Sequence, residues 1–375
     1  MTTSTPQRRV IDPHDLIPAE WLRVQPMSAT APPEQCRVYN PALVRFRGRL
    51  LMAYRVDSGR RGIMQRRIGL CQLDDYLDVV SGSVLPLSDT IHGGDPRHCD
   101  PRFLVYGDRL FIHYNNCYQT RPNQIFLVEV DPDTLAAKAP ARPLQLEGPR
   151  QVIEKNWMFF EHDGELFAVY QIAPHTILRV NLAGLGPIVC KPIHTTAWDV
   201  SPYADRFGQP CGGAPPVRRG EVYVSFFHSR RPLSRLHWVL RYWPVAPEAK
   251  TPHRVAAIGT QVPRFLVTIA RRLRQPLAQV RYSAGAYAFA AAPPFRPLWL
   301  TPEPVLRPED EPPRQRRVRA NPYANGVVYP CGVVPWDDGN WLVSYGVHDE
   351  RCCLCLVPLS DLPCHGASGA AGGGG

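Results

Sequence analysis

The 375-residue sequence has little lysine and no long apolar segment. Lysine occurs only at Lys138, Lys155, Lys191 and Lys250, so arginine carries almost all of the positive charge behind the formal net charge of +10. No apolar run reaches the roughly 18 residues of a membrane-spanning helix. The start, MTTSTPQRRVIDPHDLIPAEW, lacks the apolar core of a signal peptide. We therefore expect a cytoplasmic protein without a membrane span.

Metal binding and nucleic-acid binding also lack sequence support. The eleven cysteines lie mostly inside apolar runs, and their one cluster, RCCLCLV at 351–357, is strand-like and lacks metal-ligand spacing. Reduced, packed thiols are expected there, and no metal site. The arginines are dispersed and no nucleic-acid-binding motif is present. Biased composition with local anion sites therefore explains the charge better than a nucleic-acid partner does.

Five stretches of fifteen residues share one pattern. Each has a short apolar strand, a glycine seven or eight places after its first residue, and a second run dense in branched and aromatic residues, which together predict a β-hairpin with a glycine turn. The stretches are NPALVRFRGRLLMAY ending at Tyr54, DPRFLVYGDRLFIHY at Tyr114, NWMFFEHDGELFAVY at Tyr170, GAPPVRRGEVYVSFF at Phe227 and CGVVPWDDGNWLVSY at Tyr345.

The spacing of these repeats predicts the architecture. The first four begin 60, 56 and 57 residues apart, and the fifth follows after about two such periods. Further strand-like runs, such as RIGLCQL, QIFLVEV, TILRVNL, LHWVLRYW and CCLCLVPL, give each repeat enough strands for a propeller blade. We predict an all-β, single-domain, five-bladed β-propeller over residues 31–362. A β-sandwich is the alternative, although a period near 57 is long for one.

Three segments fall outside this pattern. Residues 1–30 form an N-terminal extension, and the glycine-rich tail at 363–375 is expected to be disordered. Residues 263–280, PRFLVTIARRLRQPLAQV, have helical apolar spacing with a basic face and read as an insertion. That insertion would either cap the propeller edge or contact a partner or an anionic surface. Whether the chain forms a homo-oligomer stays open.

The repeat register separates two aspartates that both precede Pro-Arg. Asp100 occupies the first place of the second repeat, whereas Asp95 falls outside the register. In a propeller, first-place residues and those after the closing aromatic should line one central funnel. The first set is Asn40, Asp100, Asn156, Gly213 and Cys331, and the second is Arg55, Asn115, Gln171, His228 and Gly346. Polar groups there need water, a ligand or hydrogen bonds between blades.

These residues also carry a family resemblance. The elements NPA, CDPRF, KNWMFF, GGAPPV followed by FFH, and VVYPCGVV followed by YGVHD occur in family order from about residue 40 to 357. With them the chain resembles glycoside hydrolase family 130 and its relatives, the five-bladed β-mannoside phosphorylases and mannosyltransferases.

The resemblance implies an inverting reaction at a β-mannoside. Asp100 matches the general acid, which passes its proton through a hydroxyl of the bound sugar while inorganic phosphate attacks the anomeric carbon from the opposite face. Lys155, Arg218 and His228 match phosphate-binding positions. The matching sugar-binding residues are Asn40, Arg55, Asp57, Arg102, Asn156 and Asp349. An oligosaccharide and inorganic phosphate or a sugar phosphate would be the substrates, without a further cofactor.

Departures from the family pattern keep other activities open. Gln171 stands where phosphorylases carry an arginine, and Trp157 replaces a small residue. A phosphate site with one arginine fewer would suit a β-mannosyltransferase that uses a sugar-phosphate donor. Hydrolytic relatives use two glutamates as the base, and Glu154, Glu161 and Glu165 lie in the corresponding third blade without matching those positions. A non-catalytic carbohydrate-binding propeller is the alternative of a different class. Trp157 and Tyr329 are candidates for stacking on a sugar, with core packing as the alternative role.

Overall fold

The computed structural model describes residues 8–23, 36–60, 63–117, 123–151, 153–233, 279–313 and 324–363, to which every structural statement below refers. All five predicted hairpins are present. Their strand pairs are β2 (Arg37–Phe46) with β3 (Arg49–Arg60), β5 (Cys99–Tyr106) with β6 (Arg109–Asn115), β9 (Met158–His162) with β10 (Glu165–Gln171), β14 (Val217–Arg219) with β15 (Val222–Pro232), and β19 (Val328–Pro335) with β20 (Asn340–Val347). In four of the five turns the glycine has positive φ, which explains the residue type.

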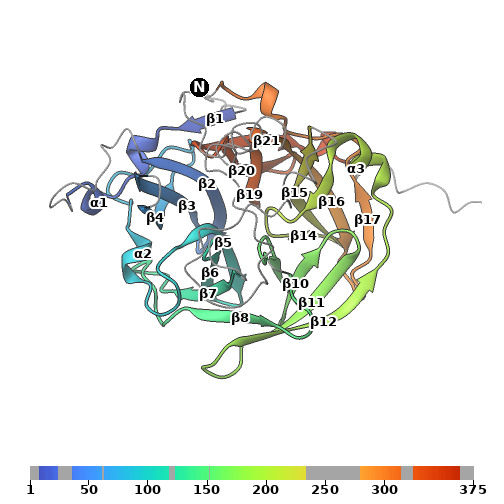
Figure 1. The fold of residues 1–375 in the computed structure, drawn as a ribbon, viewed down its shortest axis with the longest axis horizontal. Helices are drawn as coiled ribbons and strands as arrows, with labels where there is room; N and C mark the ends of the chain where they lie inside the picture. Colours follow the sequence, from blue (N-terminus) through green and yellow to red (C-terminus); the bar gives the residue numbers. More distant parts are fainter. Residues whose placement is uncertain are drawn as a thin grey trace, which may run out of the picture.

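The hairpins extend into curled, mainly antiparallel sheets arranged around the middle of the molecule (Figure 1). The sheet of β2 and β3 continues with β4 (Ile63–Leu73). A four-stranded sheet has the order β1 (Arg8–Ile11), β21 (Arg351–Pro358), β20, β19. An eight-stranded sheet has the order β5, β6, β7 (Ile125–Val130), β8 (Arg142–Leu146), β12 (Ile188–Thr196), β11 (His175–Asn181), β10, β9.

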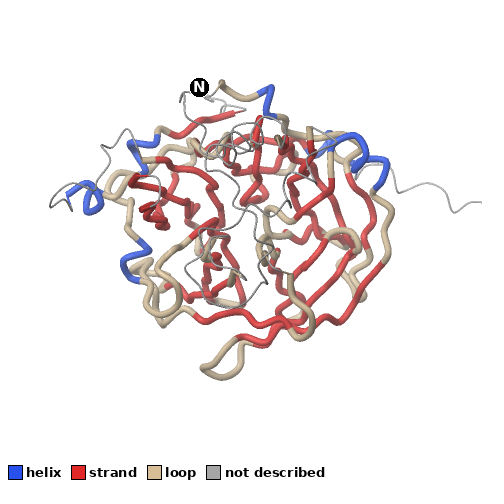
Figure 2. Tube along the Cα trace, in the orientation of Figure 1, coloured by secondary structure: helices blue, strands red, loops and turns tan. Residues whose placement is uncertain are grey.

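The remaining sheet contains the long antiparallel pairing of β15 with β16 (Val280–Ala290). Its order is β13 (Gln209–Cys211), β15, β16, β17 (Pro297–Leu300), with β14 and β18 (Ala324–Gly326) pairing beside this path. The short helices are α1 (Ala19–Arg23), α2 (Leu87–Thr90), α3 (Ser201–Phe207) and 3₁₀ turns at Pro13–Leu16, Pro308–Asp310 and Leu359–Asp361. Figure 2 shows them at the periphery. Within the described residues, no helix is long and apolar enough to cross a membrane.

Apolar side chains fill the spaces between consecutive sheets. Five buried clusters join, in turn, β2–β4 to β5–β7, β5–β8 to β9–β12, β9–β11 to β15–β16, β15–β16 to β19–β21, and β19–β21 back to β2–β4. In β21, Cys352 faces one such cluster while Cys353 and Cys355 face the next. A sheet that is covered on both faces needs apolar residues at consecutive positions, so the strands read as continuous apolar runs.

The N-terminal segment takes part in one of the sheets. Strand β1 pairs with β21, from Arg8 opposite Cys355 to Ile11 opposite Cys352. The predicted extension 1–30 therefore contributes a strand, which a four-residue segment between polar residues does not reveal by its pattern. The predicted helical insertion 263–280 lies outside the described residues except for its last two, of which Val280 begins β16. The predicted tail lies outside them from residue 364 onward.

Candidate functional site

Three first-place residues share an unusual backbone conformation. The φ angles are 55° for Asn40, 54° for Asp100 and 64° for Asn156. The hairpin registers shift at the first two positions, between Tyr39 and Ala42 and between Cys99 and Arg102. Asn and Asp tolerate the left-handed region better than other residues with a Cβ. The backbone conformation therefore explains Asn and Asp at the first place, whether or not these side chains also take part in a reaction.

Asp100 is held by two donors from the first hairpin. Asn40 Nδ2 donates to Asp100 Oδ1 at 2.7 Å, and Arg55 Nη1 donates to the same oxygen at 3.1 Å. The side chain of Asp100 retains 15% of its exposure, whereas that of Arg55 retains 10%. The structure thus brings together three of the predicted site residues and leaves Asp100 accessible.

Asp57 has a supporting place behind Arg55. Its Oδ1 accepts from Arg55 Nε at 2.7 Å, and its Oδ2 accepts from Arg55 Nη2 at 2.9 Å and from the Tyr39 hydroxyl at 2.8 Å. Asp57 is buried, with 2% exposure. Both of its oxygens are engaged, so it orients Arg55, and the predicted direct contact with a sugar does not fit this arrangement.

The charges around Asp100 decide its protonation. Burial alone raises the pKa of its carboxyl, but the positive charges of Arg55, Lys155 and Arg102, with the Asn40 hydrogen bond, outweigh burial and lower the pKa below its usual value. Asp349 shows the opposite balance. Burial, with the negative charges of Asp100 and Asp57, raises the pKa of Asp349 despite Arg55. The ligand-free site therefore holds Asp100 as a carboxylate.

Arg102 connects Asp100 to the fourth and fifth hairpin units. It is 2% exposed, and its Nε donates to Gly213 O at 3.0 Å while Nη1 donates to Pro101 O at 2.8 Å. Its guanidinium lies 5.0 Å from the centroid of the Tyr329 ring, whose hydroxyl donates to Asn156 Oδ1. Arg102 Nη2 is buried without a hydrogen-bond partner within the described residues. It is the unused donor of this group.

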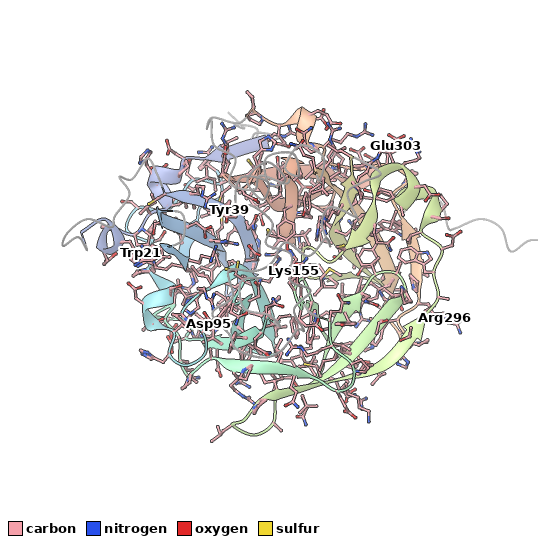
Figure 3. All side chains as sticks on the ribbon, viewed as in Figure 1. Trp21, Tyr39, Asp95, Lys155, Arg296 and Glu303 are labelled. Atoms are coloured by element: carbon pink, nitrogen blue, oxygen red, sulfur yellow. The ribbon has the colours of Figure 1, made fainter. Side chains whose placement is uncertain are left out.

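Lys155 lies at the centre of the view in Figure 3. Its side chain is exposed, and its charge acts on Asp100, His228 and Cys211. Among the described residues Lys155 makes no salt bridge. Glu154 and Asp163, two acidic residues close to it in sequence, contact other groups. An exposed, unpaired lysine beside a carboxylate is suited to an incoming anion.

His228 lies in the same group but as a neutral ring. Its Nδ1 donates to Gly212 O at 2.8 Å. Burial and the charges of Lys155, Arg102 and Arg230 lower its pKa to about 3. Nε2 then carries the lone pair and accepts a hydrogen bond. An imidazole in this state offers an acceptor, and the contact of His228 with phosphate stays a prediction.

Arg218 is not brought to this group. It lies in β14 opposite Tyr223, its Nη1 is 4.0 Å from Asp163 Oδ1, and it is exposed. His228 lies five residues farther along β15, about 17 Å at 3.3–3.4 Å per residue. An arginine of the same strand, Arg230, acts with its charge on both His228 and Cys211. Its spacing of two from His228 places both on one face of β15, a signal that the sequence offered.

The two aromatic candidates have different surroundings. Trp157 is 2% exposed, packs against Phe159 and Tyr170, and donates from Nε1 to Glu154 Oε2 at 3.2 Å. It is a core residue and presents no face to a sugar. Tyr329 is 6% exposed, contacts His228 edge to face at 4.7 Å, and belongs to the polar group.

Glycines let the hairpins approach one another at the first places. A Cβ on Gly346, the residue after the fifth closing aromatic, would lie 2.1 Å from Asn40 Oδ1. A Cβ on Gly212 would lie 2.0 Å from Asn156 O. Both contacts are too short for any side chain, so these positions require glycine. Within the described residues, no group of three or more His, Cys, Asp and Glu side chains could hold a metal ion.

Comparison with known proteins finds likeness in structure. No family model and no curated protein matches the chain. A β-1,2-mannobiose phosphorylase from Listeria innocua, solved with β-1,2-mannobiose, is 14% identical over 95% of this chain and 98% of its own, with a TM-score of 0.54. A glycosyl hydrolase from Bacteroides ovatus is 14% identical over 86% of this chain and 85% of its own, with a TM-score of 0.51.

A third solved structure belongs to work on the GH130 family of mannoside phosphorylases, which contains glycoside hydrolases that target β-1,2 mannosidic linkages in Candida mannan. It is 13% identical over 86% of this chain and 85% of its own, with a TM-score of 0.53. Structural likeness at identities this low shows a common fold alone. The predicted resemblance to glycoside hydrolase family 130 is therefore confirmed at the level of the fold.

Proposed function

We propose that this chain is a five-bladed β-propeller enzyme that degrades or synthesises β-mannosides by inverting phosphorolysis or its reversal. The blade count is supported by the five apolar clusters, each between consecutive hairpin units, the last returning to the first. The count of five blades results when the eight-stranded sheet is divided between β8 and β12, which pair in parallel at Leu144–Leu146 with Ile188–Cys190. Each half is then one blade of four strands.

One observation carries the functional proposal. The half-buried carboxylate of Asp100 lies among the cations Arg55, Arg102 and Lys155, whereas burial raises the pKa of the nearby Asp349 carboxyl. An inverting hydrolase needs a second carboxylate that activates water, whereas phosphate arrives as an anionic nucleophile and needs a cationic site. The composition of the group supports the second chemistry.

The glutamates of the third hairpin unit support the same choice. Glu154 is buried and accepts from Gln151 N at 2.6 Å, Trp157 Nε1 and the Tyr170 hydroxyl. Glu161 accepts from Gly107 N at 2.7 Å, and Glu165 contacts Arg179. All three carboxylates are engaged in contacts of the fold. Hydrolysis is therefore the less favoured alternative.

In the proposed reaction Asp100 handles the proton. In the degradative direction it donates, through a hydroxyl of the bound mannose, to the glycosidic oxygen, while phosphate forms the new bond to the anomeric carbon and the glycosidic C–O bond breaks. In the synthetic direction the carboxylate accepts that proton from the acceptor sugar. The cations that lower the pKa of Asp100 favour its role as a base in the free protein. An anion bound at Lys155 would offset their charge and favour the acid form.

The remaining residues divide between sugar and phosphate. We assign sugar contacts to Asn40, Arg55, Asn156, Asp349 and the free Nη2 of Arg102, with Asp57 and Tyr39 orienting Arg55. Lys155 and Arg230 would hold phosphate or a sugar phosphate, with the Nε2 atom of His228 accepting from a hydroxyl. No further cofactor enters this scheme.

Product analysis tests the proposal. The protein is incubated with β-linked manno-oligosaccharides with phosphate, without phosphate, and, in a third arm, with mannose 1-phosphate or a nucleotide-linked mannose plus acceptor sugars. A phosphorylase forms mannose 1-phosphate only when phosphate is present, and elongates acceptors from mannose 1-phosphate. A β-mannosyltransferase elongates the acceptor and degrades little. Free mannose released at equal rates with and without phosphate would overturn the proposal in favour of hydrolysis. Measurable sugar binding with no product in any arm would indicate a carbohydrate-binding propeller.

A further inference from the structure

Two cysteine thiols lie directly beside Asp100. Cys99 precedes it on β5, and Cys117 follows the end of the paired strand β6. The two side chains hydrogen-bond to each other. Cys99 is 0% exposed and Cys117 is 5% exposed. Among the buried cysteines of the described chain, Cys71, Cys190, Cys352, Cys353 and Cys355 face apolar clusters, whereas this pair lies near charged groups.

One asparagine side chain bonds to the backbone of both cysteines. Asn115 lies opposite Cys99 in the ladder between β5 and β6, and its Nδ2 donates to Cys99 O at 3.2 Å. Its Oδ1 accepts from Cys117 N at 2.9 Å. Cys117 has a φ of 67°, which turns the chain back after the strand. One asparagine side chain therefore fixes both cysteines, and the juxtaposition is built into the hairpin.

The two thiols differ in acidity. The hydrogen bond from Cys99, with the positive charges of Arg55 and Arg66, outweighs burial and lowers the pKa of Cys117 to about 6. Burial raises the pKa of Cys99 well above its usual value. At neutral pH the pair thus consists of a nucleophilic thiolate and a protonated partner, the combination found in reactive dithiols.

We propose that Cys99 and Cys117 are a peroxide-sensitive thiol pair whose oxidation to a disulfide displaces Asp100 and switches its site off. The Cys117 thiolate attacks one oxygen of hydrogen peroxide. An S–O bond forms, the O–O bond breaks and the leaving hydroxide becomes water. The Cys99 sulfur then attacks the sulfenic acid, forming the S–S bond and breaking S–O, and a second water leaves with the thiol proton. Two thiols lose two electrons and one peroxide becomes two waters.

The bond would act on Asp100 through the backbone. A disulfide requires about 2.05 Å between sulfurs, closer than hydrogen-bonded thiols, so Cys99 or Cys117 must move. Asp100 follows Cys99 directly, in a left-handed conformation, with its carboxylate in contacts of 2.7 and 3.1 Å. Misplacement of a reacting group by about 1 Å costs roughly 10²-fold in rate. This loss of activity rests on the proposed function, whereas disulfide formation does not.

The test uses the full chain after removal of reductant. The parent, Cys117→Ser and Cys211→Ser are treated with hydrogen peroxide, alkylated and mapped by mass spectrometry without reduction. Cys211 is the matched control, because it is half-buried near Lys155 and His228 and would report oxidation elsewhere in the site. Hydrogen exchange of the peptide that contains Asp100, and the rate in the phosphate arm, are followed before and after dithiothreitol.

We expect a Cys99–Cys117 disulfide in the parent and in Cys211→Ser, faster exchange around Asp100, and a loss of about 10²-fold in rate that dithiothreitol reverses. Cys117→Ser should resist all three changes. Absence of this disulfide, or its formation with unchanged exchange at Asp100, would overturn the proposal. Changed exchange in a protein that turns over no mannoside in any arm would support the thiol switch and contradict the proposed function alone.

Discussion

Arg55 joins two aspartates that play different parts. Its Nη1 lies 3.1 Å from Asp100 Oδ1, while its Nε and Nη2 engage the two oxygens of the buried Asp57. Such a fork-to-fork pair has a fixed geometry, which lysine does not reproduce. The position of Asp100 therefore depends on the buried carboxylate of Asp57 behind Arg55.

The first prediction is that Asp100→Asn lowers turnover by about 10²–10⁴-fold, the usual range for loss of a general acid or base. The amide keeps the size of the side chain but transfers no proton. Rates are measured in the phosphate arm, with thermal unfolding as the check on folding. Asp95→Asn is the matched control, because Asp95 pairs with Arg97 at 2.5 Å outside the group. Near-normal turnover by Asp100→Asn would contradict the assignment.

The second prediction concerns the support of Arg55. Asp57→Asn should lower kcat, although Asp57 is too deeply enclosed to meet the sugar, and should destabilise the fold by about 3–5 kcal/mol, as when one partner of a buried pair is removed. Both quantities are measured, by kinetics and by denaturant unfolding. Arg55→Lys keeps the charge but loses the fork and should reproduce the loss of kcat. Full activity in either variant would show that the orientation of Arg55 is unimportant.

The third prediction separates two cations that the family resemblance treats alike. Phosphate should stabilise the parent by RT ln(1 + [L]/Kd), about 2.7 kcal/mol at 100 times Kd. Lys155→Ala should remove most of that stabilisation, because its exposed amine acts on Asp100 and His228. Arg218→Ala should keep it, because Arg218 lies with Asp163 at the far end of the hairpin. Thermal unfolding with and without phosphate decides; equal losses would place the anion elsewhere.

The fourth prediction is that Asp349→Asn stabilises the free protein at neutral pH. Because the folded state raises the pKa of Asp349, folding loses stability as the pH rises from the unfolded pKa, about 3.9, through the folded value, and the cost persists above it. The amide removes that cost, a gain in the range of about 0.5–2 kcal/mol that single stabilising substitutions give. Unfolding at pH 7 and near pH 4 measures it, and the gain should shrink at the lower pH.

The control for that variant is Asp108→Asn, an exposed aspartate in the turn between β5 and β6. It should change stability little at either pH. Asp349→Asn should also weaken sugar binding, since a site residue commonly gains function at the expense of stability. A destabilised Asp349→Asn at pH 7 would mean that its carboxylate is a net stabilising partner of Arg55.

The hairpins were predictable because each alternates two apolar runs around a turn that needs positive φ, as at Gly48 and Gly164. The position of Asp100 beside Asn40 was predictable, because the register of those hairpins gives both residues the first place of a repeat. The charge state of His228 was not, since it depends on burial and on a bond to Gly212 O that lies sixteen residues away. The position of Arg218 could not be predicted. It depends on which strand of the fourth hairpin Arg218 faces, and the apolar pattern of the sequence does not determine this.

The last prediction uses two dianions to distinguish a neutral from a charged His228. At pH 8 phosphate is mainly HPO₄²⁻, which carries an O–H, whereas sulfate has none. A neutral imidazole with Nδ1–H bound to Gly212 O presents only an acceptor, so it binds the O–H of hydrogen phosphate and gives nothing to sulfate. His228→Ala should therefore lose about 0.5–1.5 kcal/mol of the stabilisation by phosphate, the usual net value of one hydrogen bond, and keep the stabilisation by sulfate. Because the pKa of His228 is about 3, the effect of sulfate on the parent should also stay constant between pH 5.5 and 8. Equal losses with both anions, or a sulfate effect that grows toward pH 5.5, would show that the bound anion draws a proton onto the ring and that His228 acts as a cation.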